Sequence, residues 1–293
     1  MVEFKLIIED SLNVCRTVRY FLRLLHYFTI FSVMVNIGFP SIATAVDLDQ
    51  SLIPHRAIYS MNSVGFQGDS GLSNVRGVMT YEFKDQCDAW AIESKVYLRL
   101  QYANNSESEN IRSLVTWESK DGLNFHFRLK DVTDGKLTEE IKGTAVMDGN
   151  VLGGVVKYTE PSSRKIILPP RTLFPIAHTQ SLIEYAMKGG KHLIKIIFDG
   201  ANLVNPYEVS GVVTAGSGIK NLSPAMSEVL TKIASWKIRM AYFPMKSKKQ
   251  TPDFELDIEM RADGIVSRLV QEFDGYSIEA RLSQIDFLEG ADC

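Results

Sequence analysis

The chain has 293 residues, of which 45% are hydrophobic and 23% are charged. This balance is typical of a globular protein and excludes a disordered or fibrous chain. Lysine and arginine together number 32, aspartate and glutamate together number 35, and the formal net charge is −3. Because the chain has no basic excess, we expect no nucleic-acid partner and no general binding to anionic surfaces.

The first 45 residues differ from the rest of the chain. Arg16, Arg19 and Arg23 precede a largely apolar run over residues 24–39, and residues 43–45 read Ala-Thr-Ala. A basic cluster, an apolar run and small residues in this order predict a secretory signal over residues 1–45, cleaved near Ala45. After cleavage we expect no integral membrane protein; the alternative is an uncleaved membrane anchor.

Two cysteines, Cys87 and Cys293, remain in the part of the chain that would be exported. An even number of cysteines in an oxidising compartment predicts one structural disulfide. The alternative is a reactive thiol. Asp85 and Asp88 flank Cys87, and their negative charges disfavour its thiolate.

Most of the exported chain alternates apolar and polar residues, which is typical of antiparallel strands with one buried face. The clearest runs are residues 78–83, 96–102, 125–130, 194–198, 236–242, 254–260 and 278–282. Asp-Gly pairs recur at residues 121–122, 134–135, 148–149, 199–200, 263–264 and 274–275. Their spacing suits consecutive hairpins, so we expect a mostly β protein with a dozen or more strands.

One segment breaks the alternation and predicts a helix over residues 179–188. Prolines precede it; Thr179 or Ser181 could cap its start, and Gly189 could end it. A second short helix is expected over residues 223–234, after a proline at a favoured first position. No repeat, linker or low-complexity tract divides the chain, so we expect a single domain over residues 46–293.

The main predicted helix has one apolar stripe, formed by Leu182, Ile183, Ala186 and Met187. The only large apolar surface that could bury this stripe is the concave face of the sheet. We therefore expect the helix to close one side of the sheet and the stripe to form one wall of any cavity.

Several short motifs, taken in order, resemble a family of cell envelope integrity proteins of alphaproteobacteria, formerly a family of unknown function. The motifs are LIPHRA at residues 52–57, GVMTYE at 77–82, CDAW at 87–90, WESKDG at 117–122, LPPRTLFP at 168–175 with His178, and the terminal Cys293. The chain departs from the family at Ala89 and at Pro170-Arg171, where glycine is expected, which puts the local turns in doubt.

This resemblance implies a periplasmic, many-stranded β-spiral, similar to an open barrel, with one main helix packed against it. It also implies a disulfide between an early cysteine and the C-terminal one, which falls on Cys87 and Cys293. The role that it implies is support of the cell envelope under stress, and it brings no catalytic residues with it.

The sequence indicates no metal or cofactor site. The four histidines of the exported part, His55, His126, His178 and His192, show no metal-ligand spacing. His55 could bind an anion with Arg56 or simply start a strand, and His178 could contact a ligand or only flank the helix.

The remaining candidates for chemistry have simple structural interpretations. Asp257 and Glu259 share the polar face of a strand, and no Gly-x-Ser-x-Gly motif is present. Trp90, Trp117 and Trp236 could anchor a core or line a cavity. We therefore expect no enzyme.

The preferred interpretation is a periplasmic, non-enzymatic scaffold or binding module that supports envelope integrity. One alternative is a carrier that holds a lipid or another apolar ligand in the curved sheet, and another is an enzyme acting on envelope glycans or lipids. The expected partner is accordingly an envelope protein or a lipid-like ligand.

Overall fold

The structure is a computed structural model that describes residues 52–66, 71–216, 233–245, 250–273 and 275–293. Residues Asp49–Cys293 form one compact unit. The predicted signal segment lies outside the described residues, and so does most of the second predicted helix, residues 223–234.

In the described part of the chain, fourteen strands form one sheet in which every neighbouring pair is antiparallel. The expected mostly β, barrel-like fold is therefore confirmed. The strands are β1 (His55–Phe66), β2 (Leu72–Gln86), β3 (Ala89–Tyr102), β4 (Glu107–Ser119), β5 (Asn124–Thr133), β6 (Lys136–Met147), β7 (Gly154–Glu160), β8 (Arg164–Leu168), β9 (His192–Ile197), β10 (Tyr207–Ala215), β11 (Ser235–Pro244), β12 (Phe254–Arg261), β13 (Val266–Phe273) and β14 (Tyr276–Phe287).

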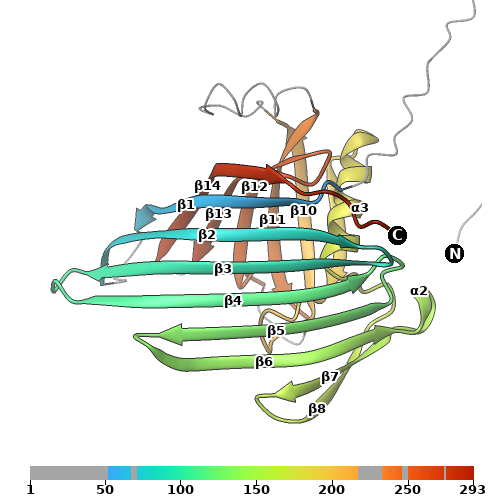
Figure 1. The fold of residues 1–293 in the computed structure, drawn as a ribbon, viewed down its shortest axis with the longest axis horizontal. Coiled ribbons are helices and arrows are strands. Elements are labelled where there is room, and N and C mark those ends of the chain that lie inside the picture. The colour runs from blue at the N-terminus through green and yellow to red at the C-terminus, as the bar shows by residue number, and fades with distance from the viewer. Residues whose placement is uncertain (1–51, 67–70, 217–232, 246–249, 274) are drawn as a thin grey trace, which may run out of the picture. The chain divides into compact units, whose positions relative to one another are not determined.

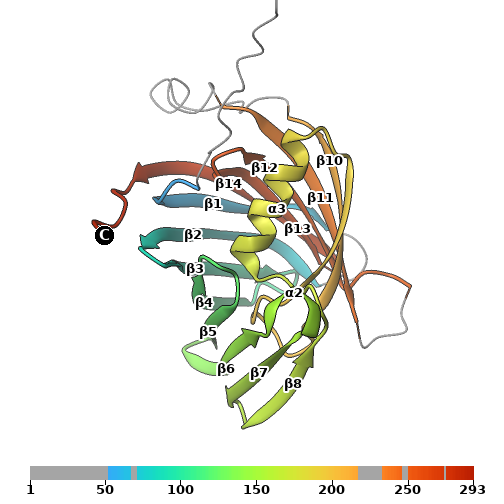
Figure 2. The same ribbon diagram turned by 90° about the vertical axis from the view of Figure 1, so that its right-hand side faces the viewer.

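The strand order is β8-β7-β6-β5-β4-β3-β2-β1-β14-β13-β12-β11-β10-β9. Each strand pairs with its neighbours in sequence, except that β1 also pairs with β14 and β8 does not pair with β9. The two edges of the open sheet, β8 and β9, are thus consecutive in the chain and are joined through the helix α3 (Pro175–Met187). Figures 1 and 2 show the sheet curling so that α3 lies inside its curve.

The chain between β8 and α3 brings the two edges of the sheet together. Leu173 forms an isolated parallel bridge with Ile197 at the end of β9. Its N–H donates to the carbonyl of Ile196 at 2.8 Å, and its carbonyl accepts from the N–H of Phe198 at 3.0 Å. These bonds narrow the gap in the sheet without closing it into a barrel.

The Asp-Gly pair between β5 and β6 illustrates how the hairpins form. Asp134 and Gly135 have φ values of 50° and 74°, which is the backbone of a two-residue turn that suits the twist of the strands. The pair at residues 148–149 does not make a hairpin turn; Gly149 begins the short helix α2 (Gly149–Leu152) instead.

The two departures from the family pattern, at Ala89 and at Pro170-Arg171, concern local turns of the backbone. Ala89 is buried as the first residue of β3, and the positive φ of that hairpin, 62°, falls on Cys87. Arg171 itself takes a positive φ of 63°, the conformation for which glycine would be favoured.

Helix α3 begins four residues before the predicted start. Its N-cap residue is Phe174, whose side chain makes no capping hydrogen bond, and Pro175 occupies the first turn. Thr179 is therefore inside the helix, where its Oγ1 donates to the carbonyl of Pro175 at 2.9 Å. The C-terminal end is as predicted: Gly189 follows with φ 76°, and its N–H donates to the carbonyl of Ala186.

An aromatic cluster fills the interior of the curved sheet next to strands β5–β7. Phe125 stacks on Phe174 with ring centroids 4.9 Å apart, and Phe127 meets Phe198 edge to face at 5.4 Å. Gly200 packs so closely here that a Cβ atom would lie 2.5 Å from the ring of Phe127. This part of the interior is therefore filled by side chains.

Candidate ligand-binding site

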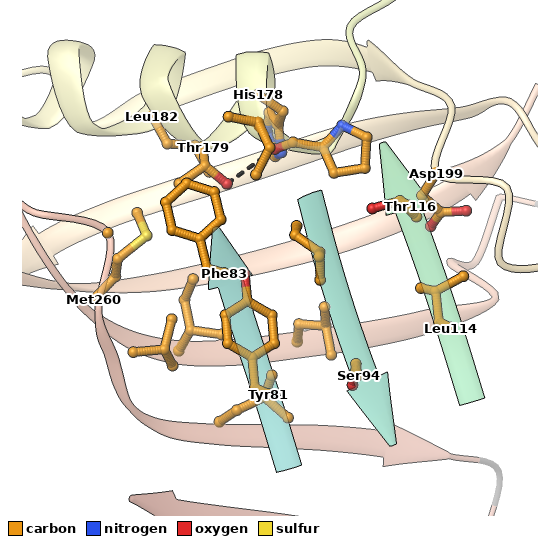
Figure 3. Close-up of a pocket in the computed structure, with 18 of the residues that line it drawn as sticks. Tyr81, Phe83, Ser94, Leu114, Thr116, His178, Thr179, Leu182, Asp199 and Met260 are labelled. Atoms are coloured by element: carbon orange, nitrogen blue, oxygen red, sulfur yellow. Dashed lines mark hydrogen bonds between the residues drawn. The ribbon is translucent and has the colours of Figure 1, made fainter. Parts of the chain in front are cut away.

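A cavity lies between the first turns of α3 and the concave face of the sheet (Figure 3). Its volume is about 390 Å³, which is in the range of small-molecule sites. Strands β1–β4 and β11–β13 line it, and on β2, β3, β4, β11 and β12 the lining residues are every second one. Examples from β2 and β12 are Met79, Tyr81, Phe83, Leu256, Ile258 and Met260. The alternation recognised in the sequence therefore produces a largely apolar wall.

Only part of the predicted helical stripe reaches this cavity. Leu182 lines it, whereas Ile183 and Ala186 are buried in the core outside the lining and Met187 is partly buried against that core. The helix contributes residues from its first two turns instead, including Ile176, His178 and Thr179. Because α3 begins at Pro175, the turns that cover the cavity precede most of the stripe.

His178 is buried in α3 and lines the cavity, so it does more than flank the helix. Burial lowers the pKa of its imidazole to about 3, and the positive charge of Lys195 acts in the same direction. The ring is therefore neutral at physiological pH and offers the cavity a polar group without a charge.

His55 starts β1, as the simpler interpretation expected. Its Nδ1 lies 2.7 Å from the carbonyl oxygen of Ile53, and burial lowers its pKa. Close to it, the buried Arg261 contacts Asp263 through two hydrogen bonds, Nε to Oδ1 at 3.1 Å and Nη2 to Oδ2 at 2.5 Å. The N–H of Ile265 also donates to Asp263. The Asp263 carboxylate is therefore satisfied, whereas Nη1 of Arg261 is buried without a hydrogen-bond partner among the described residues.

Glu118 at the end of β4 anchors the start of α3, and sequence reasoning missed this role. Its side chain is 2% exposed. Oε2 accepts from the N–H of Ile176 and Oε1 from that of Ala177, both at 2.8 Å. These N–H groups belong to the first helical turn, which has no partner within the helix. A carboxylate from a distant strand replaces the local cap.

Burial raises the pKa of Glu118 to about 7, although the two N–H groups oppose the shift. Such a shift is typical of catalytic acids, but here both oxygens are used by the backbone and Glu118 does not line the cavity. One signal was available in the sequence: Glu118 has the same parity along β4 as the inward-facing Leu114 and Thr116.

Asp199 is the second polar residue that sequence reasoning missed, because it was interpreted only as part of an Asp-Gly turn. It follows β9 and lines the cavity together with Thr116 and Ser94. Its Oδ1 accepts from the N–H of Ala201 at 2.8 Å and from Nδ2 of Asn205 at 2.7 Å. Burial raises its pKa, and these two hydrogen bonds oppose the shift.

The tryptophans and the paired acids of β12 lie away from the cavity lining. Trp90 is buried and stacks on Phe83 with centroids 4.9 Å apart, and Trp117 packs on His126. Glu259 pairs with Lys237 at 3.5 Å. The structural interpretation therefore accounts for these residues.

Cys87 and Cys293 form a disulfide in the structure, with an S–S distance of 2.06 Å. Cys87 lies in the turn between β2 and β3, so the bond attaches the last residue of the sequence to that hairpin. Neither cysteine is among the residues that line the cavity.

Two features are absent from the described ranges. No group of three or more His, Cys, Asp or Glu side chains is arranged to hold a metal ion there. Within the same ranges, no helix has both the length and the apolar character needed to cross a membrane.

An open antiparallel sheet of fourteen strands, curled around one helix and an apolar cavity, defines a β-barrel-like protein with an internal site. The chain belongs to the EipB-like family, whose family model matches residues 47–289.

Two relatives illustrate this membership. The cell envelope integrity protein EipB of Brucella abortus (strain 2308) is 26% identical over 262 residues, which cover 86% of this chain and 90% of that protein. A crystal structure of a β-barrel-like protein of a domain of unknown function, also from Brucella abortus, matches with a TM-score of 0.75 at 24% identity. The match covers 82% of this chain and 99% of that one. This second likeness supports the fold.

Proposed function

We propose that the protein supports the integrity of the cell envelope as an exported, periplasmic binding module whose cavity holds a lipid-like ligand. The envelope role is suggested by the 26% identical relative, which is named a cell envelope integrity protein. The observation that carries the binding role is the cavity of about 390 Å³ beneath α3, with its largely apolar wall. An apolar wall of this kind favours a hydrocarbon ligand over a sugar or nucleotide.

The first experiment is native mass spectrometry of the protein purified from the periplasmic fraction. We expect an additional mass that organic solvent releases and that has the composition of a lipid or a related amphiphile. Ligand-free protein from cells that contain it at normal levels, together with failure to take up added amphiphiles, would contradict the binding role.

Two neighbouring positions on β3 allow ligand binding in the cavity to be distinguished from binding elsewhere on the surface. Ser94 lines the cavity, whereas Lys95 is exposed on the opposite face of the strand. Ser94→Trp should fill the space and abolish the bound mass, and Lys95→Trp should retain it. If both variants fold and both retain the ligand, the cavity is not the binding site.

Export is the second part of the proposal and rests on the pattern of residues 1–45. Sequencing the N-terminus of the mature protein should give a start near Val46. Recovery of the full-length chain from the cytoplasm would contradict it.

A further inference from the structure

The charges on the cavity wall limit the kind of head group that a ligand can carry, if the cavity holds an amphiphile as proposed above. Of the described residues that line it, Asp199 and Asp263 are the only acids, and none is lysine or arginine. The two histidines of the lining, His55 and His178, both have lowered pKa values because they are buried. The wall therefore presents two carboxyl groups and no lysine or arginine.

The two acids are not equivalent. Asp263 is neutralised by Arg261, which contacts both of its carboxylate oxygens. Asp199 has no such partner: its Oδ1 accepts from Ala201 and Asn205, and among the described residues no hydrogen bond reaches its Oδ2. Asp199 is thus the one acid of the wall with an oxygen left to bind a ligand.

Arg112, the cation whose charge acts on Asp199, is already engaged elsewhere. Nη1 of Arg112 donates to Oδ2 of Asp131 at 2.6 Å, and its Nη2 donates to the carbonyl of Ala201 at 2.6 Å. The guanidinium attracts the Asp199 carboxylate through space but makes no hydrogen bond to it among the described residues. It therefore leaves Oδ2 open to a ligand.

Asp199, the acid with a free oxygen, lies at one end of the cavity. Figure 3 shows Asp199 and Thr116 at one end, and Met260 at the other. The lining between them is largely apolar and includes Tyr81, Phe83 and Leu182. An apolar channel that ends at an acid with a free oxygen matches an amphiphile bound with its head at Asp199.

We infer that the cavity selects amphiphiles whose head group is a hydrogen-bond donor, an ammonium group above all, and rejects those with a carboxylate or phosphate head. A donor would bind Oδ2 of Asp199 with a charge-assisted hydrogen bond. An ammonium head would favour the ionised form of Asp199 against the burial that raises its pKa, whereas an anionic head would lose its hydration with no lysine or arginine on the wall to compensate for it.

The test compares ligands that share one chain and differ only in the head: dodecylamine, dodecanol and dodecanoate. Affinities are measured by isothermal titration calorimetry below the critical micelle concentration, at about pH 8, where the amine is protonated and the acid is ionised. On the wild-type protein we expect the amine to bind about tenfold or more tightly than dodecanoate, with dodecanol between them.

Two matched variants test whether Asp199 is the source of the head-group preference. Asp199→Asn removes the charge and keeps the shape, so it should weaken amine binding about tenfold and leave dodecanol nearly unchanged. Asp257→Asn is the control, because Asp257 lies on β12 but does not line the cavity. It should bind all three ligands as the wild type does.

The outcomes separate the head-group inference from the proposed function. Equal affinities for the three ligands, or preference for dodecanoate, would overturn the inference and leave an apolar binding site in place. Failure of all three to bind would overturn the proposed function as well. The wild-type series decides the inference by itself if Asp199→Asn does not fold.

Discussion

At the scale of single residues, Glu118 is the side chain on which the position of α3 depends most. It is a carboxylate at an inward-facing position of β4, and it accepts the N–H groups of Ile176 and Ala177. An acceptor at this end of a helix also interacts favourably with the helix dipole. The same contact fixes where the cavity ends, because Ile176 lines it.

Glu118→Ala should therefore destabilise the protein. The substitution leaves two N–H groups at the buried start of α3 without an acceptor, and we expect a loss of about 2–4 kcal/mol in the free energy of unfolding. Urea denaturation measures this loss. Glu107→Ala, at an exposed position of the same strand, is the control and should change stability by less than about 0.5 kcal/mol. Equal effects of the two substitutions would contradict the anchoring role.

The raised pKa of Glu118 predicts a pH dependence with a definite sign. The pKa rises from 4.5 to about 7 on folding, so between these values the folded protein holds a proton that the unfolded chain has released. The stabilisation that this bound proton contributes is fully present below pH 4.5 and is lost as the pH rises through about 7.

Glu118→Gln is the matched variant for this effect, because it stays neutral at every pH. Relative to this variant, the wild type should lose up to about 3 kcal/mol of unfolding free energy as the pH rises across the window. Urea denaturation of both proteins over the pH range measures the difference. Parallel stability curves would mean that the pKa of Glu118 is unchanged by folding.

At the scale of elements, the existence of α3 and its end were predictable, and its start was not. Gly189 is a local signal for the end, and the structure uses it. The start depends on Glu118, which is 58 residues away from Ile176 in the sequence. No local pattern encodes such a contact, so the prediction chose Thr179 or Ser181, which are the nearest side chains able to cap.

Leu182→Ala tests how tightly α3 packs. Leu182 is 2% exposed and is the one member of the predicted stripe that also lines the cavity. Removing its side chain should cost about 2–5 kcal/mol by chemical denaturation of the ligand-free protein. Gln180→Ala, at an exposed position of the same helix, should cost little. A cost for Leu182→Ala below about 1 kcal/mol would mean that α3 covers the cavity loosely.

At the scale of the whole molecule, the alternation of residues such as Leu256, Ile258 and Met260 predicted strands with one buried face, and the sheet confirms it. The pairing of β1 with β14 and the bridge between Leu173 and Ile197 were not predictable, because both join residues far apart in the chain. The cavity depends on those contacts. Its polar end, at Asp199, was therefore hidden in a pair that the sequence presents only as a turn.

The Cys87–Cys293 disulfide acts at this largest scale, since 206 residues separate the two cysteines. Besides this bond, the segment after β14 is attached to the sheet through the N–H of Leu288, which donates to the carbonyl of Pro54 at 3.0 Å. Closing so long a loop restricts the unfolded chain, and the chain-entropy argument gives an upper limit of about 5 kcal/mol.

Replacing both cysteines by serine should lower the melting temperature by at least about 5 °C. Serine keeps the size of the side chain, and the positive φ of residue 87 is equally strained in both proteins. A reducing agent supplies the control: it should lower the melting temperature of the wild type by a similar amount and leave the double variant unchanged. If the oxidised wild type, the reduced wild type and the variant all melt together, the disulfide does not stabilise the fold.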